Sequence, residues 1–160
     1  MTIAEVSKKY GLSADTLRYY ERIGLIPPVP RTKGGVRDYG EESCGWIELM
    51  KCMRAAGVQI EALIEYVKLF RQGDSTIGAR KAILVEQRDQ LLSRMVEDCN
   101  YYLGYGNRNA KDLWANDEWE QIEIMQALYE SFPPEKKPEW LTPDDILGYG
   151  ERMLTPLGEI

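Results

Sequence analysis

Apolar residues recur at helical spacing twice near the start of the chain. The first stripe ends at Gly11, and a second helical stretch begins behind Ser13, a residue type that favours helix N-caps. The pattern predicts two short helices over residues 2–10 and 13–24, joined by a tight turn. Two short helices in this arrangement are typical of a unit that lays a helix end in a DNA groove. The apolar positions are Ile3, Val6, Tyr10 and Leu17.

A stretch rich in proline and glycine follows and cannot be helical. Residues 25–39 contain three prolines and the pair Gly34 and Gly35. Short extended pieces on either side of a Lys-Gly-Gly turn predict a small β-hairpin, or wing, with cations projecting from it. Those cations are Arg31, Lys33 and Arg37.

Apolar periodicity and capping residues predict helices along the rest of the chain. The last helix is well marked, because Thr142 is a good N-cap, Pro143 suits the first turn and two acids follow. The predicted helices cover about residues 41–56, 59–71, 75–103 and 110–132, and a short segment from residue 142.

The long predicted helix carries an apolar seam with heptad-like spacing. Arg88 and Asp98 interrupt the seam, so the coiled-coil signal is short and imperfect. A seam of this kind suits pairing with another helix. Its members are Ile77, Leu84, Leu91 and Met95.

The net charge of −6 is divided unevenly along the chain. Residues 1–40 carry seven Lys or Arg and four Asp or Glu, whereas residues 104–160 carry five and twelve. The first region therefore keeps the positive excess that suits a nucleic-acid surface, while the acid collects at the far end. Because the excess is modest, helix ends and hydrogen bonds to phosphate are expected to carry much of the docking.

Length and composition exclude several classes of protein. A chain of 160 residues holds one ordinary domain or two small ones. Its apolar runs are short, which argues against a membrane span or signal peptide and predicts a cytoplasmic protein with no membrane partner. Three widely spaced cysteines and the lack of histidine argue against a disulfide framework or a zinc site, and no cofactor is expected.

Taken in order, the motifs of the first half resemble the MerR family of transcription regulators. After the helix-turn-helix come Arg18-Tyr19-Tyr20-Glu21, Gly24-Leu25-Ile26, a proline-rich link and a Gly-Gly-Val-Arg-Asp-Tyr run that ends at Tyr39. The resemblance covers about residues 1–97. It implies a homodimer across the long helix, with two winged helices in successive major grooves of double-stranded promoter DNA.

The family acts on promoters whose −35 and −10 elements lie too far apart. The resemblance implies that the protein bends and untwists this overlong spacer, at a cost on the order of several kcal/mol, so that RNA polymerase engages both elements. Matching positions imply recognition-helix contacts by Ser13, Thr16, Arg18, Tyr19 and Tyr20. In the wing they imply contacts by Arg31, Lys33, Gly35, Arg37 and Tyr39.

The neighbours Tyr19 and Tyr20 cannot both face DNA, because adjacent helical positions diverge by about 100°. One of the two is expected in the core. Tyr20 is the favoured one, half-buried with its hydroxyl reaching a phosphate, and the reverse arrangement stays open.

The run Lys51-Cys52-Met53-Arg54-Ala55-Ala56-Gly57 resembles the thiol-based, aldehyde-responsive subgroup of the family. The resemblance implies a small electrophile as effector and Cys52 as its sensor. Lys51 and Arg54 would favour the reactive thiolate, whereas a small buried side chain is the alternative for such a cysteine. Cys44 and Cys99 are expected to be structural.

The end of the chain departs from the family pattern. Residues 94–115 and 137–142 resemble a small helical module found in large polyvalent proteins of conjugative elements and phages. The resemblance implies no particular role for the module. Its tryptophans are expected to anchor a small core, with a binding pocket as the alternative; they are Trp114, Trp119 and Trp140.

The sequence thus predicts a mainly α protein with a small β wing: a winged helix-turn-helix DNA-binding domain over residues 1–73, a dimerisation helix over 74–103 and an acidic helical module over 104–160. The predicted function is sequence-specific promoter binding and transcriptional regulation by a dimer. The alternative is a protein-interaction adaptor of a mobile element that retains the DNA-binding fold, which a lack of salt-sensitive duplex binding would favour. An enzyme has little support, since histidine, a phosphate-binding loop and a placeable acid pair are missing.

Overall fold

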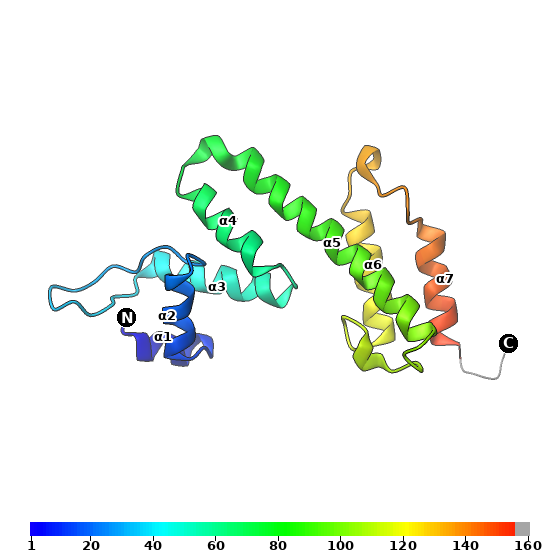
Figure 1. Cartoon of the computed structure of the whole chain (residues 1–160), viewed down its shortest axis with the longest axis horizontal. Helices are drawn as coiled ribbons and strands as arrows, with labels where there is room; N and C mark the ends of the chain where they lie inside the picture. The colour runs from blue at the N-terminus through cyan, green and yellow to red at the C-terminus, as the bar shows by residue number, and fades with distance from the viewer. Residues whose placement is uncertain (156–160) are drawn as a thin grey trace. The chain divides into compact units, whose positions relative to one another are not determined.

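The computed structural model describes residues 1–155, and its regular structure is almost entirely helical (Figure 1). This part of the chain contains seven α-helices, three short 3-10 helices and one isolated β-bridge. The mainly α fold class is confirmed, and the helical segment predicted over 110–132 divides into a 3-10 turn (Ala110–Asp112) and an α-helix. The α-helices are α1 (Ile3–Tyr10), α2 (Ala14–Arg22), α3 (Glu41–Ala55), α4 (Ile60–Phe70), α5 (Ile77–Leu103), α6 (Glu118–Glu130) and α7 (Pro143–Leu154).

The wing is less regular than the predicted hairpin. Its single bridge pairs Arg31 with Arg37, and the Thr32 amide donates to the Val36 carbonyl at 2.8 Å. The three prolines of this stretch lack the N–H groups that a longer ladder needs. The wing is therefore a loop closed by a few hydrogen bonds, with Gly35 at φ 80° in its turn.

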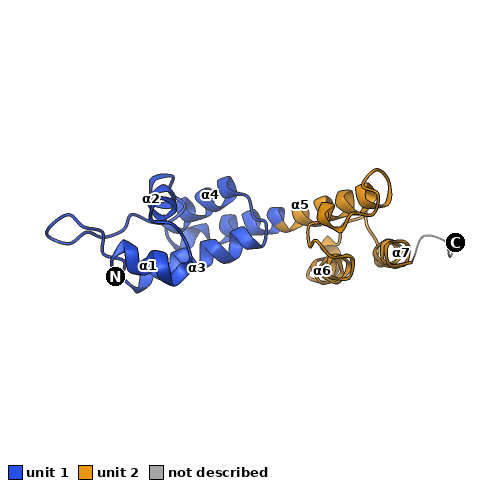
Figure 2. Ribbon diagram, turned by 90° about the horizontal axis from the view of Figure 1, so that it is seen from below, with its two compact units in different colours: residues 1–87 blue, residues 88–160 orange. Residues whose placement is uncertain are grey.

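The chain consists of two compact units, residues 1–87 and 88–160, drawn in blue and orange in Figure 2. The division lies within α5, between Gln87 and Arg88. The first unit contains α1 to α4 and the start of α5, and the second contains the rest of α5 with α6 and α7. No helix in residues 1–155 is both long and apolar enough to span a membrane.

Local capping fixes the two helices of the helix-turn-helix. Thr2 and Glu5 form a capping box at the start of α1, in which the Glu5 amide donates to the Thr2 hydroxyl at 3.4 Å. Gly11 has φ 65°, a left-handed conformation that ends α1. The Ser13 hydroxyl then accepts the Thr16 amide at 3.0 Å and starts α2.

One apolar core packs α1 and α2 with α3 and α4. Leu17 of α2 and Ile47 of α3 are fully buried in it, and the rings of Trp46 and Phe70 meet edge to face with centroids 4.9 Å apart. Helix α2 is therefore held in position by the core on its inner side, while its outer side stays accessible. The buried members of this core are Val6, Tyr10, Leu17, Leu25, Ile26, Val29, Tyr39, Cys44, Trp46, Ile47, Met50, Leu63 and Val67.

The second unit has its own core, formed by one face of α5 and the inner faces of α6 and α7, which pack against each other. Gln121 is the buried polar residue of this core: its Nε2 donates to the Met95 carbonyl at 3.1 Å and its Oε1 accepts the Ala115 amide at 3.0 Å. The apolar members are Leu92, Met95, Cys99, Tyr102, Leu113, Ile122, Met125, Tyr129, Phe132, Leu141, Ile146 and Met153.

Burial within one chain corrects the predicted dimer seam. Met95 is fully buried in the core of the second unit, so its side chain is not available to a second copy. Leu91 is half-buried against the same core, whereas Ile77 is 56% exposed. The sequence pattern of an apolar seam does not show whether a second copy or the same chain covers it. Here α6 and α7 of the same chain cover its second half.

The tryptophans of the second unit also differ from the prediction. Trp114 is half-buried against the core, but Trp119 and Trp140 are both more than half exposed. The buried face of α6 includes Ile122 and Met125, and Trp119 lies off that face in the first turn. Of the three tryptophans, one is a core anchor.

Candidate nucleic-acid interface

Leu17 points into the core, and the opposite side of α2 carries a polar and aromatic face. This face is formed by Thr16, Arg18 and Tyr19. Tyr19 is 41% exposed, the Arg18 side chain is 50% exposed, and Thr16 is half-buried. The Arg22 guanidinium lies over the Tyr19 ring, 5.5 Å from its centroid. The face offers a guanidinium, a phenol and a hydroxyl, which are groups that contact phosphates and base edges.

Hydrogen bonds in the first turn of α2 hold two of these side chains in place. The Ser13 and Thr16 hydroxyl oxygens lie 2.8 Å apart, and the Arg18 guanidinium donates to the Asp15 carboxylate at 2.6 Å. Both members of the Asp15–Arg18 pair are exposed, so water and ions weaken it. Arg18 can therefore exchange Asp15 for a phosphate at little cost.

Tyr20 turns to the inner side of α2. It is half-buried and packs against the core of the first unit, while Tyr19 stays outside with its ring centroid 6.4 Å away. The structure agrees with the favoured prediction, in which Tyr20 is the half-buried tyrosine and Tyr19 the exposed one. A phosphate contact by the Tyr20 hydroxyl stays a prediction.

The cations at the end of the wing remain at the surface. Lys33 is exposed in the turn. Arg31 is exposed as well, and its Nη1 donates to the Gly35 carbonyl at 2.9 Å. Gly35 contributes a left-handed backbone that other residues adopt with strain. The wing thus presents two accessible cations on a turn of defined shape.

Arg37 belongs instead to an ion pair that joins the wing to α2. Its Nε donates to Oε2 of Glu21 at 2.5 Å, and Oε1 of the same carboxylate accepts the Val29 amide at 3.0 Å. The two side chains are only 24% and 14% exposed. Burial alone raises the pKa of Glu21, but the hydrogen bonds from Arg37 and Val29 outweigh it, so this pKa is lowered. The carboxylate stays charged and fixes the position of the wing relative to α2.

Glu21 is the residue of this candidate interface that sequence reasoning missed. It lies within the Arg-Tyr-Tyr-Glu motif, but its partner Arg37 is 16 residues further along the chain. The available signal was an acid near the end of α2, followed by several cations. That signal does not select one partner among them.

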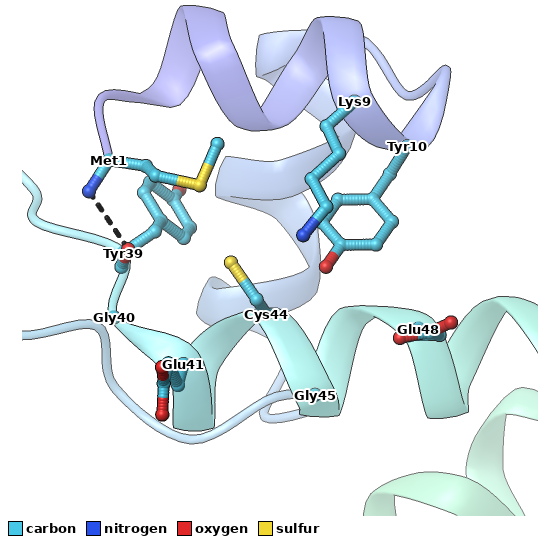
Figure 3. A pocket seen from close by; sticks show the side chains of 9 residues that line it. All are labelled: Met1, Lys9, Tyr10, Tyr39, Gly40, Glu41, Cys44, Gly45 and Glu48. Atoms are coloured by element: carbon cyan, nitrogen blue, oxygen red, sulfur yellow. Dashed lines mark hydrogen bonds between the residues drawn. The ribbon is translucent and has the colours of Figure 1, made fainter.

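Tyr39 was predicted to contact DNA, and its burial contradicts that prediction. It is 1% exposed, its hydroxyl has no hydrogen-bond partner in the described chain, and burial raises its pKa. Figure 3 shows Tyr39 with Lys9 and Cys44 around a cavity of about 410 Å³, lined by residues of α1 and α3. An aromatic side chain directly before α3 packs inward because the helix-turn-helix core lies there.

The three cysteines lie in different environments. Cys52 is exposed, whereas Cys44 and Cys99 are buried, as expected of structural thiols. Burial raises the pKa of Cys99 to about 11. Among residues 1–155, no group of three or more metal-binding side chains is arranged to hold an ion. Cys52 is therefore the thiol that solvent reaches most readily.

The two cations next to Cys52 are held by backbone carbonyls. Lys51 Nζ donates to the Tyr10 carbonyl at the end of α1 at 2.5 Å, and Arg54 donates to the Val58 carbonyl at 2.6 Å. These contacts tie α3 to its neighbours. Exposure, more than these cations, favours a reactive Cys52.

Two family models match the chain, one on each half. The model for MerR HTH family regulatory proteins matches residues 1–69, and the model for large polyvalent protein-associated domain 11 matches residues 85–153. The first match covers the helix-turn-helix, the wing and α3, and the second covers most of the second unit. Both resemblances predicted from the sequence are confirmed.

The chain is similar to several known members of the first of these families. AdhR, an HTH-type transcriptional regulator of Bacillus subtilis, is 61% identical over 92 residues, which are 58% of this chain and 66% of AdhR, just under two thirds. A MerR family regulator from Listeria monocytogenes has a crystal structure with 42% identity and a TM-score of 0.59, covering 79% of this chain and 97% of that one. HiNmlR, a MerR family regulator crystallised with promoter DNA, shares the fold at 23% identity and a TM-score of 0.55, over 79% of this chain and 95% of its own.

Proposed function

Because the chain belongs to the MerR family of DNA-binding transcription regulators, we propose that it controls transcription by binding promoter DNA through α2 and the wing. The observation that carries this proposal is the outer face of α2, where Arg18 and Tyr19 stand on a capped and packed helix. Lys33 and Arg31 would reach phosphates beside the groove that receives α2.

Two copies of the chain are required for the regulation that we propose. Each winged unit covers one half-site of a two-fold operator, so a dimer places two α2 helices in successive major grooves. The dimer bends and untwists an overlong promoter spacer, and RNA polymerase then engages both promoter elements. The deformation costs on the order of several kcal/mol, which binding at two half-sites offsets.

We propose Cys52 as the site where a small electrophile acts. Its thiol is exposed on α3, and it adds to an aldehyde carbonyl to give a hemithioacetal, with the thiol proton ending on the new hydroxyl. The adduct would lie next to Lys51, whose hydrogen bond to the Tyr10 carbonyl joins α3 to α1. A change at Cys52 therefore has a short route to the helix-turn-helix packing.

Selection of bound duplexes from a random library tests the proposed DNA binding. We expect a two-fold symmetric sequence to be enriched, and its affinity to fall steeply with salt. In transcription with purified RNA polymerase, inserting the selected sequence into an overlong spacer should change promoter output. A folded chain that enriches no sequence would overturn the proposal.

A protein-interaction adaptor is the second candidate function. The observation in its favour is the exposure of Trp119 and Trp140 on a unit that matches the polyvalent protein-associated domain, since tryptophan is enriched at protein–protein interfaces. An adaptor would keep the DNA-binding fold without salt-sensitive duplex affinity. The duplex selection separates the two functions.

A further inference from the structure

An open cavity of about 380 Å³ lies between α6 and α7 in the second unit. Its walls include Tyr129 and Glu130, at the end of α6, and Pro143, Ile146 and Leu147, at the start of α7. Because the end of one helix lies beside the start of the next, the two helices run antiparallel. Figure 2 shows them next to each other on one side of the second half of α5.

The cavity opens on the side of both helices that is turned away from α5. On α7, the Tyr149 hydroxyl donates to Asn100 of α5 at 2.8 Å, and Leu147 lies about 160° around the helix from Tyr149. On α6, Gln121 donates to a backbone carbonyl of α5 at 3.1 Å, and Glu130 lies about 180° around the helix from Gln121. Helix α5 therefore packs on the opposite side and does not cover the cavity.

Exposed apolar side chains extend this surface along both helices. Trp119 lies about three turns before Glu130 on the same side of α6 and is 64% exposed. On α7, Leu147 is 52% exposed and Leu154, about two turns further along, is 39% exposed. The antiparallel order brings Leu154 to the end of the surface where Trp119 lies. Together with the cavity, these three apolar side chains form the α6–α7 groove, which is about three helical turns or 17 Å long.

Acidic side chains border the α6–α7 groove along both helices. Glu123 and Glu130 are exposed on α6, on the side turned away from α5. On α7, Asp144 and Glu151 are exposed within about one turn of Leu147. The groove thus combines an apolar floor with a negative rim on each side.

The cations of this region leave the rim negative. Residues 118–155 carry nine Asp or Glu and three Lys or Arg. Lys137 lines the cavity, but its ammonium group donates to the Tyr129 carbonyl at 3.1 Å and lies 4.2 Å from the centroid of the Tyr129 ring. The Arg152 guanidinium lies 4.8 Å from the Tyr149 ring centroid, on the side of α7 toward α5. Both cations are held within the unit, so a ligand that neutralises the rim must supply its own positive charge.

We infer that the α6–α7 groove binds a basic amphipathic helix of a partner protein. An apolar groove between two helices receives a third helix through apolar side chains at i, i+3 or i+4 and i+7, and three turns of groove suit such a segment. Lys or Arg beside those side chains would pair with the acids of both rims. With α5 on the other side of α6 and α7, the bound helix makes the unit a four-helix bundle. The inference goes beyond promoter binding and holds whether or not the chain binds DNA.

The charge of the groove also selects the class of partner. Two copies of this chain that met groove to groove would bring acids against acids, so a different protein is the favoured occupant. The phosphates of DNA or of a membrane surface are repelled for the same reason.

Selection from a displayed library of helical peptides identifies the chemistry that the groove takes. The peptides have about four helical turns with randomised outer positions, and the target is the full chain. We expect the enriched peptides to carry apolar residues at i, i+3 or i+4 and i+7, flanked by Lys or Arg. Enrichment of acidic peptides, or of no peptide, would overturn the inference.

Matched variants of the full chain place a selected synthetic peptide on the groove. Leu147→Arg removes an apolar contact and opposes the charge of the peptide, so it should weaken binding about tenfold or more, whereas Tyr105→Arg, at a 91% exposed position, should not. Glu123→Lys should weaken binding several-fold, whereas Glu97→Lys, exposed on α5, should not. Isothermal titration calorimetry gives the affinities, and circular dichroism shows that each variant is folded. Equal losses for a variant and its control would contradict the inference.

Sedimentation equilibrium without peptide tests a second copy as the occupant. Leu147→Arg should leave the molecular mass in solution unchanged, because the groove is not an interface between copies. A lower mass would assign the groove to a second copy and refute the inference. These measurements contain no DNA, so a failed duplex selection would remove promoter binding and leave the result for the groove unaffected.

Discussion

Both units of the chain have exposed cations, but the first unit carries some of its own on a capped helix and a turn, whereas two arginines of the second unit are used inside it. In the first unit, Arg18 and Lys33 remain at the surface. In the second, the Arg88 guanidinium lies 3.6 Å from the centroid of the Phe132 ring, and Arg108 donates to two carbonyls at the end of α7. Net charge alone therefore says little about where DNA binds. We expect the place of the exposed cations, on α2 and the wing, to decide it.

The number of acidic residues also differs between the two units. Residues 1–87 carry thirteen Lys or Arg and eleven Asp or Glu, whereas residues 88–160 carry seven and fifteen. An acidic surface repels the phosphate backbone. We therefore expect changes in the second unit to leave duplex affinity intact, unless they act through assembly.

The largest effect should come from unfolding the second unit alone. Met95→Asp places a carboxylate in an apolar core, which costs several kcal/mol of folding free energy. Circular dichroism melts should lose the transition of the second unit, while the first unit keeps its own transition and its duplex binding at saturating protein. Met95→Leu is the matched control. Loss of both transitions would show that the units do not fold independently.

Removing one accessible cation from α2 should have the next largest effect. Arg18→Ala should weaken binding to the selected duplex by about 1–3 kcal/mol and reduce the salt slope by about one. Lys111→Ala, the loss of an exposed cation in the second unit, should change neither quantity. Fluorescence anisotropy over a salt series measures both, and equal losses for the two variants would break the comparison between the units.

The ion pair between the wing and α2 predicts a pH dependence within the first unit. Because folding lowers the pKa of Glu21, the pair stabilises the fold fully above the unfolded carboxyl pKa of about 4.3, and this stabilisation is lost as pH falls through the lowered value. Between about pH 5 and pH 3, the wild type should lose about 1 kcal/mol more unfolding free energy than Glu21→Gln.

Urea unfolding at several pH values measures this difference. Glu61→Gln, at an exposed position on α4, is the control and should follow the wild type. If Glu21→Gln shows the same acid dependence as the wild type, the pair does not contribute to folding and the wing is positioned by other contacts.

The smallest effect concerns the thiols, since labelling reports on access without changing the fold. Cys52 should react first with N-ethylmaleimide and Cys99 last, because a pKa of about 11 leaves about one thiolate in a thousand at pH 8. Mass spectrometry of the native protein gives the order. Equal rates for Cys52 and Cys99 would mean that the second unit opens as readily as the surface of α3.

Helix boundaries were predictable because their signals are local. Ser13 and Thr142 begin α2 and α7 as predicted, and Gly11 ends α1. Each cap acts on amides or carbonyls within one turn of the helix, so the order of residues is sufficient. The same periodicity required only that one of Tyr19 and Tyr20 turn inward, and the packing of Tyr20 against the core decides which one does.

Contacts between distant segments were not predictable. The Glu21–Arg37 pair, the burial of Tyr39 and the burial of Met95 each depend on which elements pack together. An apolar position shows the same pattern whether a second copy or another part of the chain covers it. For that reason the bounds of α2 were predicted well and the burial of Met95 was not.

Gln121 has a consequence for how the second unit can vary. Its buried amide bonds to the Met95 carbonyl on one side and the Ala115 amide on the other. Sliding α6 along α5 by a single residue would break the hydrogen bond from Nε2 to the Met95 carbonyl and leave a buried donor unpaired, at about 1–3 kcal/mol. Apolar side chains alone tolerate several neighbouring alignments. This one side chain therefore sets the register of α6 against α5. The apolar residues around it can be exchanged for others of different shape while the register stays the same.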